Sequence, residues 1–119
     1  MKLTQRIEED LTLIRLGGQL LGGPDAEQLR SALLAAVEQS SPHILIDMSE
    51  VSWVNSTGLG ILISSHLAAR QKGGALKLIG VSKRIESILS VTRLNTVFEI
   101  FPSEEEGRRS FSAASAGKP

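Results

Sequence analysis

The stretch Val51-Ser-Trp-Val-Asn-Ser-Thr-Gly-Leu-Gly-Ile-Leu-Ile63 runs from an apolar patch through small polar residues into a second apolar run. The patch from Val51 to Val54 predicts a strand, and the pattern from Gly58 to Lys72 predicts a helix. Asn55, Ser56 or Thr57 can cap that helix, because each offers a side-chain oxygen to a free N–H of the first turn. The stretch therefore predicts a strand followed directly by a helix.

On the N-terminal side, alternating apolar residues predict two short strands, over residues 3–7 and 11–13, that form a hairpin. The glycine pairs Gly17-Gly18 and Gly22-Gly23 are expected to break this pattern. A helix is expected to begin at Gly23-Pro24-Asp25, since proline suits the first helical position, and to be ended by Ser40-Ser41-Pro42. The continuous apolar run over residues 43–47 indicates a strand that is covered on both faces.

On the C-terminal side, Gly73-Gly74 is expected to end the central helix, and residues 75–79 to form a strand. Ser82 is expected to cap a further helix, and residues 98–101 to form a last short strand. A capping box over residues 103–106 predicts a final helix with Phe111 as its main apolar anchor.

Strands that alternate with helices predict an α/β fold in a single domain over residues 1–111. We expect a mixed sheet of about four to five strands with about four helices packed on it. Residues 112–119 are small and polar, and are expected to form a flexible C-terminal tail.

The composition excludes several classes of function. The 119 residues contain 13 basic and 13 acidic side chains and no cysteine. A net charge of zero gives no long-range attraction to nucleic acid or to an anionic membrane. The polar N-terminus is unlike a signal peptide, and no apolar run approaches the ~20 residues that span a bilayer. We therefore expect a cytoplasmic protein that neither inserts into membranes nor binds nucleic acid directly.

Two roles fit Ser56, and the local pattern leaves both open. The first is a plain helix cap. The second is a modification site, because a phosphate at a helix N-terminus is tolerated by the helix dipole and the free N–H groups. The fold would survive about −1.5 to −2 added charges, whereas a partner docked there would not. Gly58 would let such a partner approach the backbone, and Gly60 would let the helix lie close to the sheet.

A helical wheel predicts which side of the central helix is buried. Five residues fall on one side, which is expected to contain the buried stripe: Leu59, Leu62, Ile63, Leu67 and Arg70. Ile61 falls almost opposite and is expected to face water, one turn from Ser56. It is then either an isolated exposed side chain or part of a partner surface. Trp53 is expected in the core.

Three segments resemble the STAS domain, and within it the bacterial anti-sigma factor antagonists. They are Ile44-Leu-Ile-Asp-Met-Ser49, Val51-Ser-Trp-Val-Asn-Ser-Thr-Gly-Leu-Gly60 and Gly73-Gly-Ala-Leu-Lys-Leu-Ile-Gly-Val-Ser82. The resemblance covers roughly residues 3 to 111. Its most specific part is the Ser-Thr-Gly-Leu-Gly core that follows an apolar strand.

The resemblance implies a binding switch. Unphosphorylated antagonists of this family bind an anti-sigma factor and so release a sigma factor. The anti-sigma factor is a serine kinase that holds ATP and Mg²⁺, phosphorylates the antagonist and loses affinity for it, and a separate serine phosphatase restores the antagonist. The phosphoserine of the family falls on Ser56. The acidic residue of the preceding strand falls on Asp47.

Asn55 departs from the family pattern, in which aspartate most often precedes the phosphoserine. Asparagine keeps the capping ability and loses the charge, which leaves a non-phosphorylated role open. The residues expected to bind the partner are Asn55, Ser56, Thr57, Gly58, Leu59, Ile61 and Asp47.

Other functions remain as alternatives. A STAS scaffold, or a regulatory subunit of a lipid-transport or sensory complex, would use the same surface without phosphorylation. A small hydrolase built on Ser56 has no identifiable base. His43 and His66 are lone histidines that are expected to pack, so we nominate no catalytic residue, no metal site and no cofactor.

Overall fold

The computed structural model describes residues 1–8, 10–39 and 42–116, with side chains as far as Phe111. A single mixed sheet with the strand order β1-β2-β3-β4-β5 forms its centre. The elements along the chain are β1 (Lys2–Ile7), β2 (Thr12–Leu20), α1 (Gly23–Val37), β3 (His43–Val54), α2 (Ser56–Gln71), β4 (Ala75–Ile79), α3 (Lys83–Val91), a 3-10 turn (Leu94–Thr96), β5 (Ile100–Phe101) and α4 (Glu104–Ala116). The predicted α/β fold, with a mixed sheet and packed helices, is confirmed.

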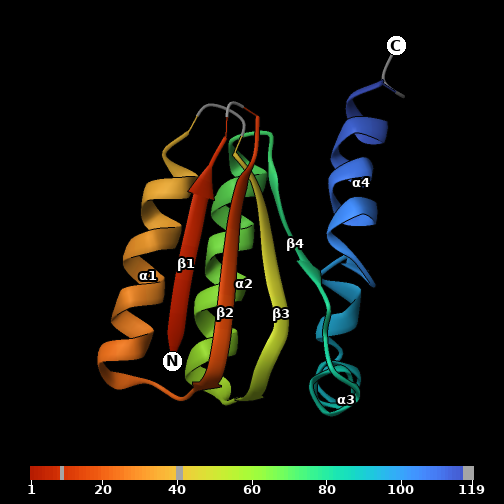
Figure 1. Ribbon diagram of the computed structural model, residues 1–119. Helices are drawn as coiled ribbons and strands as arrows, with labels where there is room; N and C mark the ends of the chain where they lie inside the picture. The colour runs from red at the N-terminus through yellow and green to blue at the C-terminus, as the bar shows by residue number, and fades with distance from the viewer. Residues whose placement is uncertain (9, 40–41, 117–119) are drawn as a thin grey trace.

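The sheet separates two layers of helices (Figure 1). β1 pairs antiparallel with β2, as the predicted hairpin requires, while β2, β3, β4 and β5 run parallel. Helices α1 and α2 lie on one face, and α4 lies on the other beside β3, β4 and β5. The parallel strands end at the lower edge in Figure 1, where α1, α2 and α3 begin.

Alternation along β3 divides the core between these two layers. Ile44, Ile46 and Met48 belong to the large apolar cluster under α1 and α2. Leu45 points the other way, into a small cluster with Phe111 of α4. β3 is thus buried on both faces, as its apolar run predicts.

The hairpin and the central strand are longer than expected. β2 continues through Gly17-Gly18, where its register with β3 shifts, and Gly18 has a φ of 88°. The prediction that these glycines end the strand is wrong, because they form an irregularity within it. Likewise, residues 43–47 and the patch from Val51 to Val54 are two ends of one strand, β3.

The helix ends agree with most of the expected caps. Ser82 accepts a hydrogen bond from the N–H of Ile85 at 3.2 Å, and Ser103 accepts one from Glu106 at 3.3 Å. α1 ends at Val37, and the expected end at Ser40-Ser41 lies outside the described residues. α4 reaches Ala116, which includes part of the expected tail, while residues 117–119 lie outside the described residues.

The predicted orientation of α2 is confirmed for Leu59 and Leu62, which are buried, but is wrong for Leu67 and Ile61. Ile61 is only 5% exposed, whereas Leu67 is 54% exposed. The buried residues are Gly58, Leu59, Ile61, Leu62, His66 and Ala69. Helix α2 packs against α1 as well as against the sheet, so a second flank, which includes Ile61, is covered.

His66 is part of the buried side of α2. Its ring lies in the buried stripe, where Nδ1 accepts the N–H of Leu76 at 3.2 Å and the ring meets Phe98 edge-on at 5.6 Å. The expected packing role of His66 is confirmed. Leu67 follows about 100° further round the helix and is exposed, because the buried stripe is turned toward α1 rather than toward Leu67.

Candidate functional site

The predicted switch residues lie at the lower edge of the sheet in Figure 1, where β2 and β3 end and α1 and α2 begin. In sheets of parallel strands this carboxyl edge is where binding sites occur most often. β3 ends at Val54, Asn55 takes an extended conformation and Ser56 is the first residue of α2. No loop separates the strand from the helix, so Ser56 has a fixed position.

Asn55 holds this junction with both ends of its side-chain amide. Its Oδ1 accepts the N–H of Gly58 at 3.1 Å, which caps α2. Its Nδ2 donates to the carbonyl oxygen of Leu21 in the β2–α1 loop. The backbone N–H of Asn55 also donates to Leu20, at 3.1 Å. An aspartate could provide the cap but not the donor to Leu21, so asparagine joins two segments that a carboxylate would leave separate.

Ser56 and Thr57 are both exposed on the first turn of α2. The N–H groups at this end of a helix have no acceptor within the helix and carry a partial positive charge. The first turn contains no acidic side chain. A phosphate on either hydroxyl would therefore meet backbone donors and no carboxylate from that turn.

The two glycines of the motif have opposite surroundings. A β-carbon on Gly58 would lie 2.7 Å from Leu20 and 2.9 Å from Val54, so this glycine lets α2 pack on the core. The prediction that Gly58 admits a partner is therefore wrong. A β-carbon on Gly60 would meet no atom within 4 Å beyond the adjoining backbone of α2, so the prediction that Gly60 brings the helix close to the sheet is wrong as well.

Two exposed apolar residues lie at the ends of the strands that lead to the switch residues. Leu21, whose carbonyl holds Asn55, is 45% exposed. Trp53, two residues before Asn55, is 39% exposed rather than in the core, and the guanidinium carbon of Arg84 on α3 lies 5.9 Å from its ring centre. We call Leu21, Trp53, Ser56 and Thr57 the switch edge. Its two apolar members were missed, because single apolar residues at element ends carry no periodic signal.

Asp47 lies on the other face of the sheet from α2. Its Oδ2 accepts from Nε of Arg15 at 3.3 Å, and its Oδ1 accepts the N–H of Ser49 at 2.9 Å. Arg15 also donates to Glu104 of α4 at 2.7 Å. The structure thus does not bring Asp47 together with Ser56, and the carboxylate takes part in a structural ion network.

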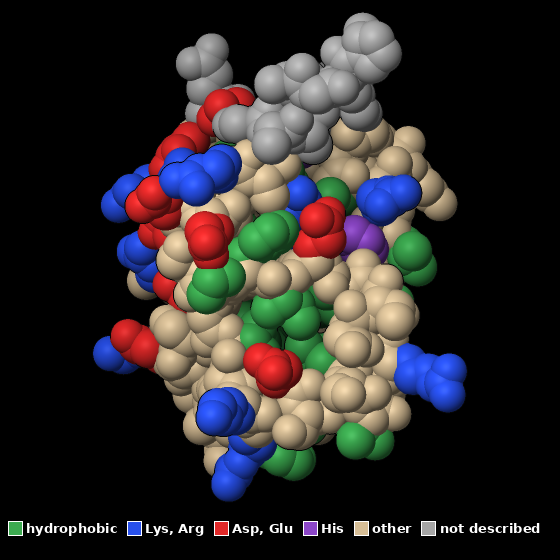
Figure 2. Space-filling view, turned by 90° about the vertical axis from the view of Figure 1, so that its right-hand side faces the viewer, with side chains coloured by type: hydrophobic (Ala, Val, Ile, Leu, Met, Phe, Trp, Pro, Cys, Tyr) green, Lys and Arg blue, Asp and Glu red, His purple; other side chains and the backbone are tan. Residues whose placement is uncertain are grey.

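This network continues along α4. Arg108 donates to Glu104 at 2.7 Å and, through two nitrogens, to both carboxylate oxygens of Glu8 at 2.8 Å. These bonds raise the pKa of Arg108, and its guanidinium lowers the pKa of Glu8. Charges of both signs are intermixed on the side of the molecule that α3 and α4 form (Figure 2).

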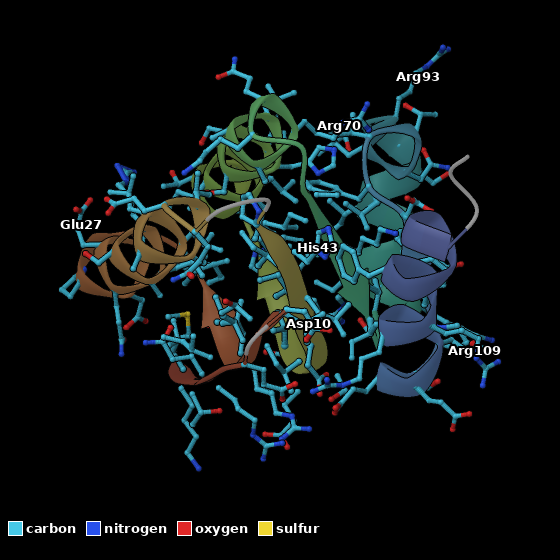
Figure 3. All side chains as sticks on the ribbon, turned by 90° about the horizontal axis from the view of Figure 1, so that it is seen from above. Asp10, Glu27, His43, Arg70, Arg93 and Arg109 are labelled. Carbon is cyan, nitrogen blue, oxygen red and sulfur yellow. The ribbon has the colours of Figure 1, made fainter. Side chains whose placement is uncertain are left out.

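Under α4 the remaining polar groups are also paired. His43 lies between the sheet and α4 and stacks on Phe111 at 4.7 Å, which confirms its packing role (Figure 3). Lys77, 5% exposed, donates to Ser110 at 3.0 Å, and its Nζ lies 4.3 Å from the ring centre of Phe111. Over the described residues, no three His, Cys, Asp or Glu side chains are grouped as a metal site, and no helix is long and apolar enough to cross a membrane.

Comparisons with known proteins agree with this geometry. A family model described as the STAS domain matches residues 2–107. The anti-sigma-B factor antagonist of Bacillus subtilis (strain 168) is 32% identical over 82 residues, or 69% of this chain and 74% of the relative.

Two solved structures share the fold. An anti-sigma-factor antagonist (STAS) domain protein from Planctomyces limnophilus has a TM-score of 0.83 at 22% identity, over 92% of this chain and 97% of that one. The phosphorylated form of the Bacillus cell fate determinant SpoIIAA has a TM-score of 0.74 at 20% identity, over 92% and 99% of the two chains.

Proposed function

The chain belongs to the STAS domain family, with anti-sigma factor antagonists among its relatives, and we propose that it is itself an antagonist whose partner binding is switched at Ser56. In the unphosphorylated state it binds an anti-sigma factor in the cytoplasm, which frees a sigma factor. Phosphorylation of Ser56 by that partner ends the complex, and a serine phosphatase restores it. The chain acts by binding and turns over no substrate of its own.

The observation that carries this proposal is the exposed position of Ser56 on a helix end that is both capped and packed. The Asn55 cap fixes the first turn of α2, and Gly58 packs that turn against Leu20. A hydroxyl held in this way can enter the active site of a kinase without local unfolding. Holding the nucleophile in place is a large part of what phosphoryl transfer requires.

The chain contributes only the nucleophile to the reaction. The Ser56 oxygen bonds to the γ-phosphorus of ATP held by the partner, the bond from that phosphorus to the bridging oxygen breaks, and ADP leaves. The hydroxyl proton passes to a base of the partner. Mg²⁺ belongs to the nucleotide site of the partner, so the antagonist needs no metal ligand.

The switch follows from where the new charge lies. The free N–H groups of the first turn of α2 can accept a phosphate, so the antagonist keeps its fold. A partner surface packed on Leu21 and Trp53 would have to desolvate or repel about two negative charges. The loss of affinity therefore needs no conformational change in the antagonist.

Asn55 is compatible with this role. The cap on Gly58 requires only an oxygen, which asparagine provides. The neutral side chain also leaves the unphosphorylated switch edge without a carboxylate next to Ser56. The added phosphate then places about two negative charges where Asn55, Ser56 and Thr57 carry none.

Phosphosite mapping tests the proposal. The chain is incubated with ATP, Mg²⁺ and each purified serine-kinase anti-sigma factor that the source genome encodes, and its phosphopeptides are sequenced by mass spectrometry. We expect one phosphate, on Ser56, and none in the Ser56→Ala variant. Phosphate on Thr57 in the wild type, or none with any of these kinases, would contradict the proposal.

A further inference from the structure

The switch edge is too small to hold a partner alone. Its four residues compare with about 20–30 residues a side in a stable protein complex. If the proposed function holds, the partner must cover a neighbouring surface as well. We propose that this surface is an open groove between α1 and α2, and that a segment of the same anti-sigma factor occupies it.

The groove has a volume of about 360 Å³ and runs along the line where the two helices meet. Its walls are mainly apolar: Leu33, Leu34 and Val37 on α1, and Gly60, Ile61 and Ala68 on α2. Leu34 is 59% exposed at its rim, although it is a large apolar side chain. Such a surface gains stability when an apolar side chain of another molecule covers it.

Gly60 indicates that the groove has a use beyond folding. Glycine within a helix costs about 0.5–1 kcal/mol relative to alanine. At Gly58 a side chain would clash with Leu20 and Val54, but at Gly60 nothing beyond the adjoining backbone of α2 lies within 4 Å of the missing β-carbon. The missing side chain keeps this end of the groove open and lets another backbone approach α2.

The groove begins at the switch edge. Thr57 belongs to the switch edge and also lines the groove, and Gly60 follows one turn later on the same helix. A partner that reaches the Ser56 hydroxyl therefore already covers one end of the groove. Covering the rest extends the contact along α1 and α2 toward Ala68, without crossing a charged strip.

The polar groups of the groove indicate the chemistry of its occupant. The hydroxyl of Ser64 donates to the carbonyl oxygens of Gly60 and Ile61, at 2.9 and 3.3 Å, so it is already paired within α2. Arg30 is the one charged residue among the described residues that line the groove. Its guanidinium lies 3.7 Å from Glu27 in a contact exposed to solvent, so it can still pair with a second acidic group. The occupant is therefore an apolar segment with an acidic side chain that faces Arg30.

Two matched substitutions test this inference. Leu34→Glu places a charge on the rim of the groove, and Leu67→Glu makes the same change at a similarly exposed leucine of α2 outside the groove. The affinity of each variant for the anti-sigma factor that phosphorylates the wild type is measured by calorimetry with ADP and Mg²⁺. We expect Leu34→Glu to weaken binding by about tenfold or more and Leu67→Glu to leave it unchanged.

Each other outcome has a definite meaning. Equal affinities for both variants and the wild type, or an equal loss in both variants, would overturn the groove inference. Dimerisation of the chain that Leu34→Glu abolishes, with partner affinity unchanged, would assign the groove to a second copy. Ser56→Asp is measured in the same series, and if it weakens binding while Leu34→Glu does not, the switch stands without the groove. If no anti-sigma factor binds the wild type, the proposed function fails and this inference fails with it.

Discussion

The switch edge and the α4 face of the sheet both contain polar residues, but those of the α4 face are paired with one another and those of the switch edge are exposed. On the α4 face, Asp47, Glu104 and Glu8 are paired with Arg15 and Arg108. On the switch edge, the hydroxyls of Ser56 and Thr57 are exposed beside apolar side chains. The charged residues of the α4 face thus stabilise the fold, while the small uncharged residues of the switch edge form the surface that phosphorylation can charge.

The same contrast exists within α2. One flank, with Gly58 and Ile61, is required for packing, and another, with Gly60 and Leu67, is exposed. Substitutions at Gly58 and Ile61 should therefore lower the stability of the fold markedly, whereas substitutions at Gly60 and Leu67 should not. The predictions below follow this division from the largest expected effect to the smallest.

Ile61→Asp should have the largest effect on folding. It places a carboxylate in the apolar cluster between α1 and α2, so we expect the free energy of unfolding to fall by about 3–5 kcal/mol. Leu67→Asp is the control and should cost about 1 kcal/mol or less. Urea denaturation followed by circular dichroism measures both. Comparable losses in the two variants would show that the orientation of α2 is wrong.

Gly58→Ala should also destabilise the fold. Its β-carbon would lie within 3 Å of Leu20 and Val54, and relieving that contact requires a shift of α2. We expect a loss of about 1–3 kcal/mol in the same denaturation experiment. An unchanged midpoint would mean that the first turn of α2 is free to move, and that Ser56 is not rigidly held.

Gly60→Ala should have a smaller effect, of the opposite sign. Alanine gains about 0.5–1 kcal/mol of helix stability where nothing obstructs its methyl group. Partner affinity should fall at the same time, because the methyl group enters the groove. A more stable variant with unchanged affinity would remove Gly60 from the binding surface.

The smallest effect concerns pH. Burial, and then the positive charge of Arg70, lower the pKa of His66 below its ordinary value of 6.5. Below about pH 6.5 the unfolded chain therefore takes up a proton that the folded protein resists, and the stability present above that pH is gradually lost. A His66→Gln variant should show a flatter decline from pH 7 to pH 5 in thermal unfolding. The same decline in the variant and the wild type would mean that another group controls the stability between pH 7 and pH 5.

The sequence predicts the layers and most element positions, because strand and helix periodicities and capping residues act locally. Ser82 and Ser103 cap their helices as expected. Gly17-Gly18 shows where local reasoning fails, since pairing with β3 keeps these glycines in a strand. The prediction of which flank of α2 is buried fails for a related reason. Ile61 is covered by α1, which is distant in the sequence.

The features of the candidate site also divide into those that local sequence predicts and those that depend on the fold. Local chemistry predicts a cap from Asn55, Ser56 or Thr57, and the structure shows that Asn55 provides it and that Ser56 is exposed. Asp47, Leu21 and the groove depend on which segments the fold brings together. Asp47 was assigned by resemblance alone, and the alternation of β3 places it on the α4 face.

The central claim is that phosphate on Ser56, by its charge alone, separates the chain from its anti-sigma factor. The most direct measurement is the dissociation constant of that complex with the chain unphosphorylated and with the chain phosphorylated at Ser56 only, together with circular dichroism of both forms. We expect identical spectra and an affinity that falls by about a hundredfold or more, since burying two unpaired charges costs several kcal/mol. Equal affinities for the two forms would contradict the account, and so would a phosphorylated chain that has lost its fold.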